Sequence, residues 1–374
     1  MPEPKTDSFL PLPALDVLEG AQGPVADNAG EALPLMAVLR RSGQKFLSWS
    51  QVQMMLRCGE QYRRRYINGE RIPPGIAQLI GTGTHVAIRT NLQAKLSGKD
   101  VNLAYLSDVV DTVMDRERRE KGLNLQHEEA ARGEAVVWTE AKAAARACAH
   151  CHKFQVAPHI VPEAVESERA VQPPLEGLPL LVGVLDIVER LEGATTPIRV
   201  RDTKTSRRTP PANAAHASDQ LTAYAYLLAY STRDRVIPHL RIDSLVIQAK
   251  DPLAPEVRYV PLDTVRTLEH LESFGARLAA TALAITKGVF LPCLRDAWWC
   301  DARWCGYYPT CPYVRGTITM PVPAGPIRPA VPEKQRPKRA AQPRRKSNES
   351  TRTRGGTPSL FAGARSRGRR GRRA

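Results

Sequence analysis

Apolar residues recur at two different spacings along this chain, and the alternation between them predicts the order of its elements. Spacings of three and four residues, typical of helices that bury one face, alternate with β-branched runs that favour strands. The predicted helices cover 51–67, a long stretch from 81 to about 154, 219–228 and 264–285. The predicted strands cover 163–171, 178–189, 198–204, 240–249 and 257–260. This order predicts one α/β or α+β domain over residues 46–315, with a mixed sheet flanked by helices and a helical segment at its N-terminal side.

The two ends of the chain lack such spacing. Residues 1–45 contain six prolines without a sustained apolar period and are expected to form a disordered leader. Residues 316–374 turn to proline, glycine and arginine, and we expect them to form a disordered basic tail.

The tail changes how the charge of the chain is interpreted. The formal net charge is +16, but residues 321–374 hold 16 Lys and Arg against two acids, so this segment carries +14 and the remainder only +2. Basicity therefore indicates nucleic-acid contact for the tail alone, where 365–373 could neutralise phosphates; an idle solvated tail is the alternative. Within the tail, Ser359-Leu360-Phe361 could dock on a replication or recombination protein.

Several classes of protein are excluded on composition. No run approaches the ~20 apolar residues of a membrane span, so an integral membrane protein is not expected. No basic segment followed by an apolar run suggests a secretory signal, so the expected location is the cytoplasm. An odd number of cysteines, seven, argues against a disulfide framework.

Two carboxylates and a lysine form the most informative motif. Gly183-Val184-Leu185-Asp186 puts an acid on an apolar strand, and Asp202-Thr203-Lys204 follows on the next strand. Because successive side chains of a strand alternate, Asp202 and Lys204 should share a face, and Asp186 can meet them if the strands pair as a hairpin. Hard oxygen ligands with a nearby cation suit Mg²⁺-dependent phosphodiester cleavage. A chance pairing on an exposed strand edge is the alternative.

Residues on two helices add to this motif. Gln220 and Tyr224 are four positions apart and therefore lie on one helix face. Gly81-Thr82-Gly83-Thr84-His85 is expected to begin a helix, where the ring of His85 could be a further ligand or a structural residue.

Taken in order, these blocks resemble the RecB-like branch of the PD-(D/E)XK nucleases, over roughly residues 47–315. The resemblance implies a restriction-endonuclease-like core. It also implies that His85, Asp186 and Asp202 are ligands of Mg²⁺ or Mn²⁺ and that Lys204 is the catalytic lysine. Gln220 and Tyr224 would organise the site and the DNA strand. Either Glu166 or Glu168 could also face the site.

Four of the cysteines are concentrated near the C-terminal end of the predicted domain, between 293 and 311. One upstream cysteine and three downstream resemble the iron–sulfur staple of AddB-like and CRISPR-associated RecB-like nucleases, although the spacing C-x4-C-x5-C is longer by two residues than the usual C-x2-C-x5-C. The resemblance implies a [4Fe–4S] cluster on Cys58, Cys300, Cys305 and Cys311. Zinc on Cys293, Cys300, Cys305 and Cys311, or simple buried thiols, are the alternatives.

The predicted function is therefore a metal-dependent DNA nuclease. We expect an exonuclease that acts on single strands or duplex ends in recombination, repair or phage DNA processing. The alternative is a non-cleaving nucleic-acid-binding or CRISPR-adaptation subunit that keeps the fold.

Overall fold

Six strands form one mixed sheet at the centre of the chain. The computed structural model describes residues 39, 43, 45–194, 196–248 and 250–316. The strands are β1 (Phe46–Ser48), β2 (Pro162–Val171), β3 (Leu180–Arg190), β4 (Ile198–Ser206), β5 (His239–Gln248) and β6 (Glu256–Thr264). The helices are α3 (Trp49–Arg57), α4 (Gly59–Tyr62), α5 (Ile76–Leu96), α6 (Leu103–Lys121), α7 (His127–Arg132), α8 (Glu134–Cys151), α9 (Asp219–Ser231), α10 (Leu268–Thr286) and α11 (Pro312–Arg315).

Two strands, β1 and β4, pair with different parts of the same edge of β3. The order is β1-β3-β4-β5-β6, with β2 on the other edge of β3. β1 pairs parallel with residues 180–182 of β3, whereas β4 pairs antiparallel with residues 187–190. On the edge of β3 that β1 and β4 share, residues 183–186 therefore have no strand partner among the described residues. Helix α9 packs closely on the face of β3 at this position, because a Cβ on Gly183 would lie 2.4 Å from Leu227 Cδ1.

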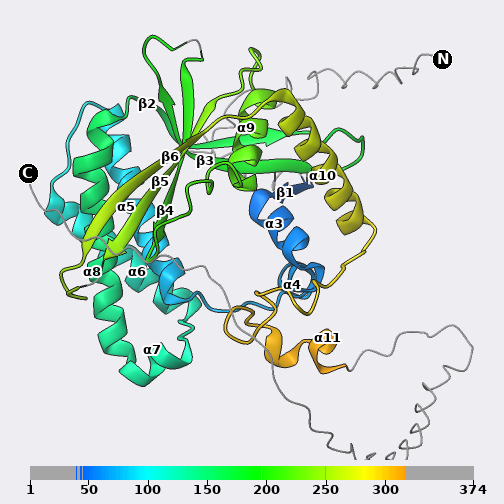
Figure 1. Cartoon of the computed structure of the whole chain (residues 1–374), viewed down its shortest axis with the longest axis horizontal. Coiled ribbons are helices and arrows are strands. Elements are labelled where there is room, and N and C mark those ends of the chain that lie inside the picture. Colours follow the sequence, from blue (N-terminus) through cyan, green and yellow to red (C-terminus); the bar gives the residue numbers. More distant parts are fainter. Residues whose placement is uncertain (1–38, 40–42, 44, 195, 249, 317–374) are drawn as a thin grey trace, which may run out of the picture. The chain divides into compact units, whose positions relative to one another are not determined.

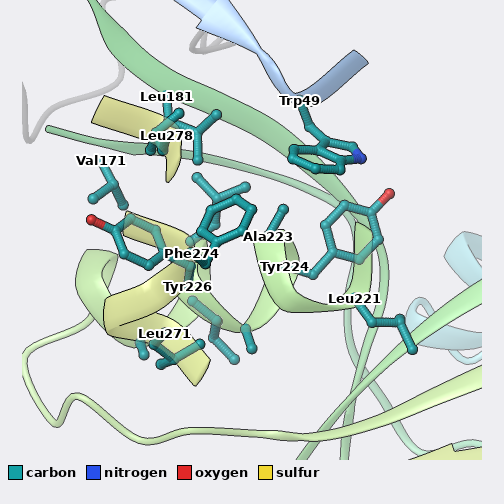
Figure 2. Packing of buried hydrophobic residues seen from close by; sticks show 14 of the residues in the cluster. Trp49, Val171, Leu181, Leu221, Ala223, Tyr224, Tyr226, Leu271, Phe274 and Leu278 are labelled. Atoms are coloured by element: carbon teal, nitrogen blue, oxygen red, sulfur yellow. The ribbon is translucent and has the colours of Figure 1, made fainter. Parts of the chain in front are cut away.

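Helices cover both faces of the sheet, so the fold has three layers (Figure 1). One core joins the sheet to α3, α9 and α10, and its aromatic centre brings the Phe274 ring 5.5 Å from Trp49 and 5.3 Å from Tyr226. Figure 2 shows these rings packed together with Leu181 and Leu278. A second core joins the other face to α5, α6 and α8. The prediction of a mixed sheet flanked by helices is confirmed, and the fold is consistent with the restriction-endonuclease-like core.

Two helix predictions need correction. The helix predicted over 51–67 is interrupted at Cys58, whose extended backbone (φ −167°, ψ 110°) separates α3 from α4. The cause lies in the tertiary structure, since the Gly59 N–H donates to the Leu291 carbonyl at 2.7 Å and fixes the chain there. The helix expected to begin at Gly81 begins at Ile76, and the stretch up to about 154 contains four helices, α5 to α8. Strand β1 was not predicted.

The remaining expectations about chain ends lie mostly outside the described residues. These are the leader over 1–45, the tail over 316–374 and the Ser359-Leu360-Phe361 motif. No helix in the described ranges is long and apolar enough to cross a membrane.

Candidate active site

The site lies where β3 and β4 separate. Their antiparallel ladder ends at the pair Ile187 and Arg201, so Asp186 and Asp202 are the next residues on each strand. Beyond this point the Asp186 side chain replaces the ladder, because its Oδ2 accepts a hydrogen bond from the Thr203 N–H at 3.3 Å. The two strands do pair as a hairpin, which is the condition under which the sequence lets Asp186 meet Asp202, and the pairing brings the two carboxylates to one place.

Asp202 and Lys204 share a face of β4, as strand alternation predicts. Lys204 Nζ lies 3.0 Å from Asp202 Oδ1 and 2.9 Å from Oδ2. The Asp202 carboxyl is buried, whereas the Lys204 side chain is 44% exposed. The carboxylate is thus held inside the protein, and the ammonium group remains accessible from solvent.

Helix α9 connects these groups to one another. Its N-terminus is capped by Ser218, which accepts from the Leu221 N–H, and this orients the first turn. Gln220 then accepts from Lys204 Nζ at 2.9 Å and donates to Asp202 Oδ1 at 3.2 Å. The Gln220 amide also donates to the Tyr224 hydroxyl at 2.8 Å. One amide therefore fixes the lysine, the carboxylate and the tyrosine.

His85 approaches the same point from α5. Its Nε2 lies 2.8 Å from the Thr203 carbonyl, and its Nδ1 lies 3.4 Å from Asp186 Oδ2. Since a carbonyl only accepts, Nε2 carries the proton in this contact. Nδ1 then faces a carboxylate oxygen, and either a proton on Nδ1 or a bound cation can bridge the two atoms.

Burial and neighbouring charges both shift the pKa values of the groups at the site. Burial raises the pKa of Asp202 to about 7; the Lys204 charge opposes this, and the Asp186 charge adds to it. Burial also raises the pKa of Tyr224, as do the charges of Asp186 and Asp202. Two neighbouring carboxylates with one lysine favour uptake of a proton or binding of a metal cation.

Of the two candidate glutamates, Glu166 lies at the site. It lines a small cavity of about 20 Å³ together with His85, Asp186 and Thr203, and this volume is close to that of one water or ion. Glu166 has a positive φ of 52° within β2, and it accepts from Arg89 Nη1 at 2.8 Å. Glu168 pairs with Val184 in the ladder between β2 and β3.

The carboxylate and imidazole groups of the site are ligands of the kind that hard divalent cations bind. Carboxylate oxygens and an imidazole nitrogen converge beside Asp186 in the middle of β3, and oxygen-rich sets of this kind are preferred by hard cations. No group of three or more His, Cys, Asp or Glu side chains within the described ranges is arranged as a metal-binding set. Lys204 donates to Asp202 Oδ1, whereas the buried Asp202 Oδ2 lies 2.9 Å from Lys204 Nζ but has no hydrogen-bond partner among the described residues.

The opposite face of β4 holds an ionic cluster that the sequence analysis missed. Arg201 is 2% exposed, and its guanidinium contacts Glu189 at 2.8 Å and Asp243 at 3.1 Å. Arg199 donates to Glu189 at 2.9 Å, and the Tyr259 hydroxyl donates to Asp243 at 2.7 Å. Asp243 on β5 was an available signal, because a charged residue in an apolar strand needs a partner.

The structure brings the cysteines of both predicted ligand sets together. One small cavity is lined by Cys58, Cys293, Cys300, Cys305 and Cys311. The Cys293 N–H donates to Cys58 Sγ at 3.4 Å, and burial together with the neighbouring thiols Cys58 and Cys300 raises the pKa of Cys293 to about 12. Five soft donors around one small cavity suit a thiophilic metal or a cluster in chemistry, and both ligand sets lie at this cavity.

Comparison with known proteins identifies the family. The family model for the PD-(D/E)XK nuclease superfamily matches residues 46–312. This match covers more than half of the chain, and the protein therefore belongs to the PD-(D/E)XK nuclease superfamily.

Two solved structures are also similar to the chain. The crystal structure of a "Putative exonuclease" from Eubacterium rectale is 11% identical, with a TM-score of 0.42, and the match covers 79% of this chain and 97% of that one. The crystal structure of SSO0001 is 12% identical, with a TM-score of 0.30, covering 70% and 94%. No curated protein matches the chain.

Proposed function

We propose that the domain over residues 46–315 is a metal-dependent deoxyribonuclease, and specifically an exonuclease that acts on single strands or duplex ends. The observation that carries the proposal is the connection of Asp202, Lys204 and Gln220 by three hydrogen bonds beside Asp186. Burial also raises the pKa of Asp202 to about 7, and strongly perturbed carboxyl groups cluster at catalytic sites. Recombination, repair and phage DNA processing are the processes that such an enzyme would serve.

In this proposal each residue has a distinct task. Asp186, Asp202 and His85 would hold one or two Mg²⁺ or Mn²⁺ ions. The bound metal would supply Lewis acidity and a water of lowered pKa. Lys204 places its ammonium beside the phosphate and stabilises the charge that develops there. Gln220 positions Lys204, and Tyr224 supports Gln220 from the buried side of α9.

The direct test is digestion of end-labelled single- and double-stranded DNA with Mg²⁺, Mn²⁺ or EDTA. Lys204→Ala should lower the cleavage rate by about 10²–10³-fold, because it removes a preorganised cation from the transition state. Lys142→Ala is the matched control, since Lys142 also contacts a carboxylate, Asp115 Oδ2 at 2.6 Å, but lies on α8. Progressive shortening from one end, with closed circular DNA left intact, would support an exonuclease.

A non-cleaving nucleic-acid-binding subunit is the second candidate. Under that alternative the metal-containing reactions leave both substrates intact, while the protein still binds DNA. Cleavage by wild type, together with undiminished cleavage by Lys204→Ala, would contradict the assignment of the site.

We further propose that Cys58, Cys300, Cys305 and Cys311 bind a structural [4Fe–4S] cluster. The support is their position around one small cavity, although they come from segments more than 240 residues apart. A cluster there would close a long loop and join the α3–α4 junction to the segment after α10. Zinc on a set that includes Cys293 is the competing possibility.

Metal analysis of two variants separates these possibilities. With a cluster, anaerobically purified protein should be brown and contain iron and sulfide in similar amounts. Cys58→Ala should remove both, whereas Cys293→Ala should retain them. A colourless zinc protein in which only Cys293→Ala loses metal would reject the proposed ligand set.

A further inference from the structure

A third cavity lies at the C-terminal end of β4 and shares no lining residue with the cavity at Glu166 or the cavity at Cys58. Its volume is about 250 Å³. Ile76 and Ile80 of α5, Val137 of α8 and Ile247 of β5 provide an apolar lining, and the last residues of β4 form one side. The neighbouring parts of the fold, α5, α8 and the sheet, are seen together in Figure 1.

This cavity is close to the candidate active site along two elements. Ser206 lines it and is two residues beyond Lys204 on β4, a separation of about 6.6 Å at the rise of a strand. Ile80 lines it and is five residues before His85 on α5, which corresponds to about 7.5 Å along a helix. Along both elements, the cavity is therefore separated from the candidate active site by about the length of one nucleotide in an extended strand.

The charges at the cavity indicate which part of a nucleotide it suits. Two acids, Glu129 and Glu140, and two bases, Arg132 and Arg207, line it, and Arg132 is paired with Glu140. A lining with balanced charges and an apolar floor offers a phosphate no net positive charge. It suits an uncharged base better, because the flat apolar faces of a base can pack on the isoleucine side chains.

We propose that this cavity binds the unpaired base of a nucleotide adjacent to the phosphate that is cleaved. The proposal rests on the proposed nuclease function and specifies its substrate. A stacked, paired base cannot enter such a cavity without leaving the duplex. The preferred substrate is therefore single-stranded DNA or a frayed end.

The test compares two substitutions on adjacent residues of α5. Ala77 lines the cavity and is exposed, so Ala77→Phe fills it from the rim without disturbing the core. Gln78 is also exposed but does not line the cavity, which makes Gln78→Phe the matched control. Both variants are assayed on a series of single-stranded oligonucleotides in which one abasic nucleotide is moved stepwise past a fixed cleavage position.

In wild type and in Gln78→Phe, one abasic position next to the cleaved phosphate should lower kcat/KM about tenfold. In Ala77→Phe the intact substrate should already show that loss, and the abasic position should have no further effect. Equal cleavage of every abasic substrate by wild type would overturn the base site while leaving the nuclease function in place.

A binding measurement covers the case in which no substrate is cleaved, which would contradict the nuclease function instead. Single strands carrying 2-aminopurine at successive positions are bound to the full-length protein in Ca²⁺. A fluorescence change confined to one position, and lost in Ala77→Phe, supports the base site without any cleavage. The same fluorescence at all positions overturns it.

Discussion

Replacing Arg201 with methionine should destabilise the domain strongly while leaving every proposed catalytic group in place. Arg201 lies on β4 next to Asp202 but points to the opposite face, where it is 2% exposed. Glu189 and Asp243, which it contacts, are 1% and 0% exposed. Methionine has a similar length but no charge, so the substitution leaves two buried carboxylates without their shared cation.

The expected cost is about 3–5 kcal/mol, the range for breaking a buried ion pair by removal of one partner. The lower half of that range is expected because each carboxylate keeps one donor. Arg199 remains 2.9 Å from Glu189, and the Tyr259 hydroxyl remains 2.7 Å from Asp243. A loss of this size would be a large part of the about 5–15 kcal/mol that stabilises an ordinary domain.

Urea denaturation followed by circular dichroism measures this loss as a shift of the midpoint at constant slope. Arg241→Met is the matched control. Arg241 also contacts a carboxylate, Asp263 Oδ1 at 2.6 Å, but Asp263 is 57% exposed, so that pair should contribute only about 0–1 kcal/mol. The triple variant Glu189→Gln, Arg201→Met, Asp243→Asn should recover part of the stability, because no charge remains buried.

Equal midpoints for Arg201→Met and Arg241→Met would refute the reasoning. So would a triple variant less stable than Arg201→Met alone, because the loss would then come from packing and not from uncompensated charge.

Three further outcomes are expected. Burial raises the pKa of Asp202 to about 7, so the folded state favours the protonated carboxyl group. The free energy of unfolding of the metal-free protein should therefore fall as pH rises from about 4 to 7. Denaturant titrations across this pH range should show a flatter dependence for Asp202→Asn. Gly59→Ala should lower the melting temperature by several degrees, because its Cβ would lie 2.6 Å from the Leu291 backbone, whereas Gly75→Ala, with its nearest neighbour at 3.7 Å, should be tolerated. Truncation after Gly316 removes a segment that includes the +14 charge, so it should weaken DNA binding and reduce the salt dependence of that binding. Fluorescence anisotropy across a salt series measures both effects. Cleavage at saturating DNA should be unchanged.

Local patterns were sufficient to predict the strands of the hairpin and which side chains share a face. Alternation along a strand places Asp202 and Lys204 on one face whatever else the chain does, and helical spacing does the same for Gln220 and Tyr224. Short β-branched runs separated by turn residues predicted β2 to β6 because they reflect local conformational preference and one buried face. These features depend on neighbours within a few residues, and the sequence contains them fully.

Contacts between distant segments were decided by the tertiary structure alone. The spacing around Cys58 is helical, yet the hydrogen bond from Gly59 to the Leu291 carbonyl breaks the helix there. Glu166 and Glu168 were equivalent in the sequence, but the positive φ of Glu166 accompanies its place at the cavity beside Asp186. Arg201 finds one partner, Glu189, on the preceding strand β3 and the other, Asp243, on β5, which follows only after α9. Each of these outcomes depends on which distant segments pack against each other. A local residue pattern does not specify that packing, because it results from the fold of the whole domain.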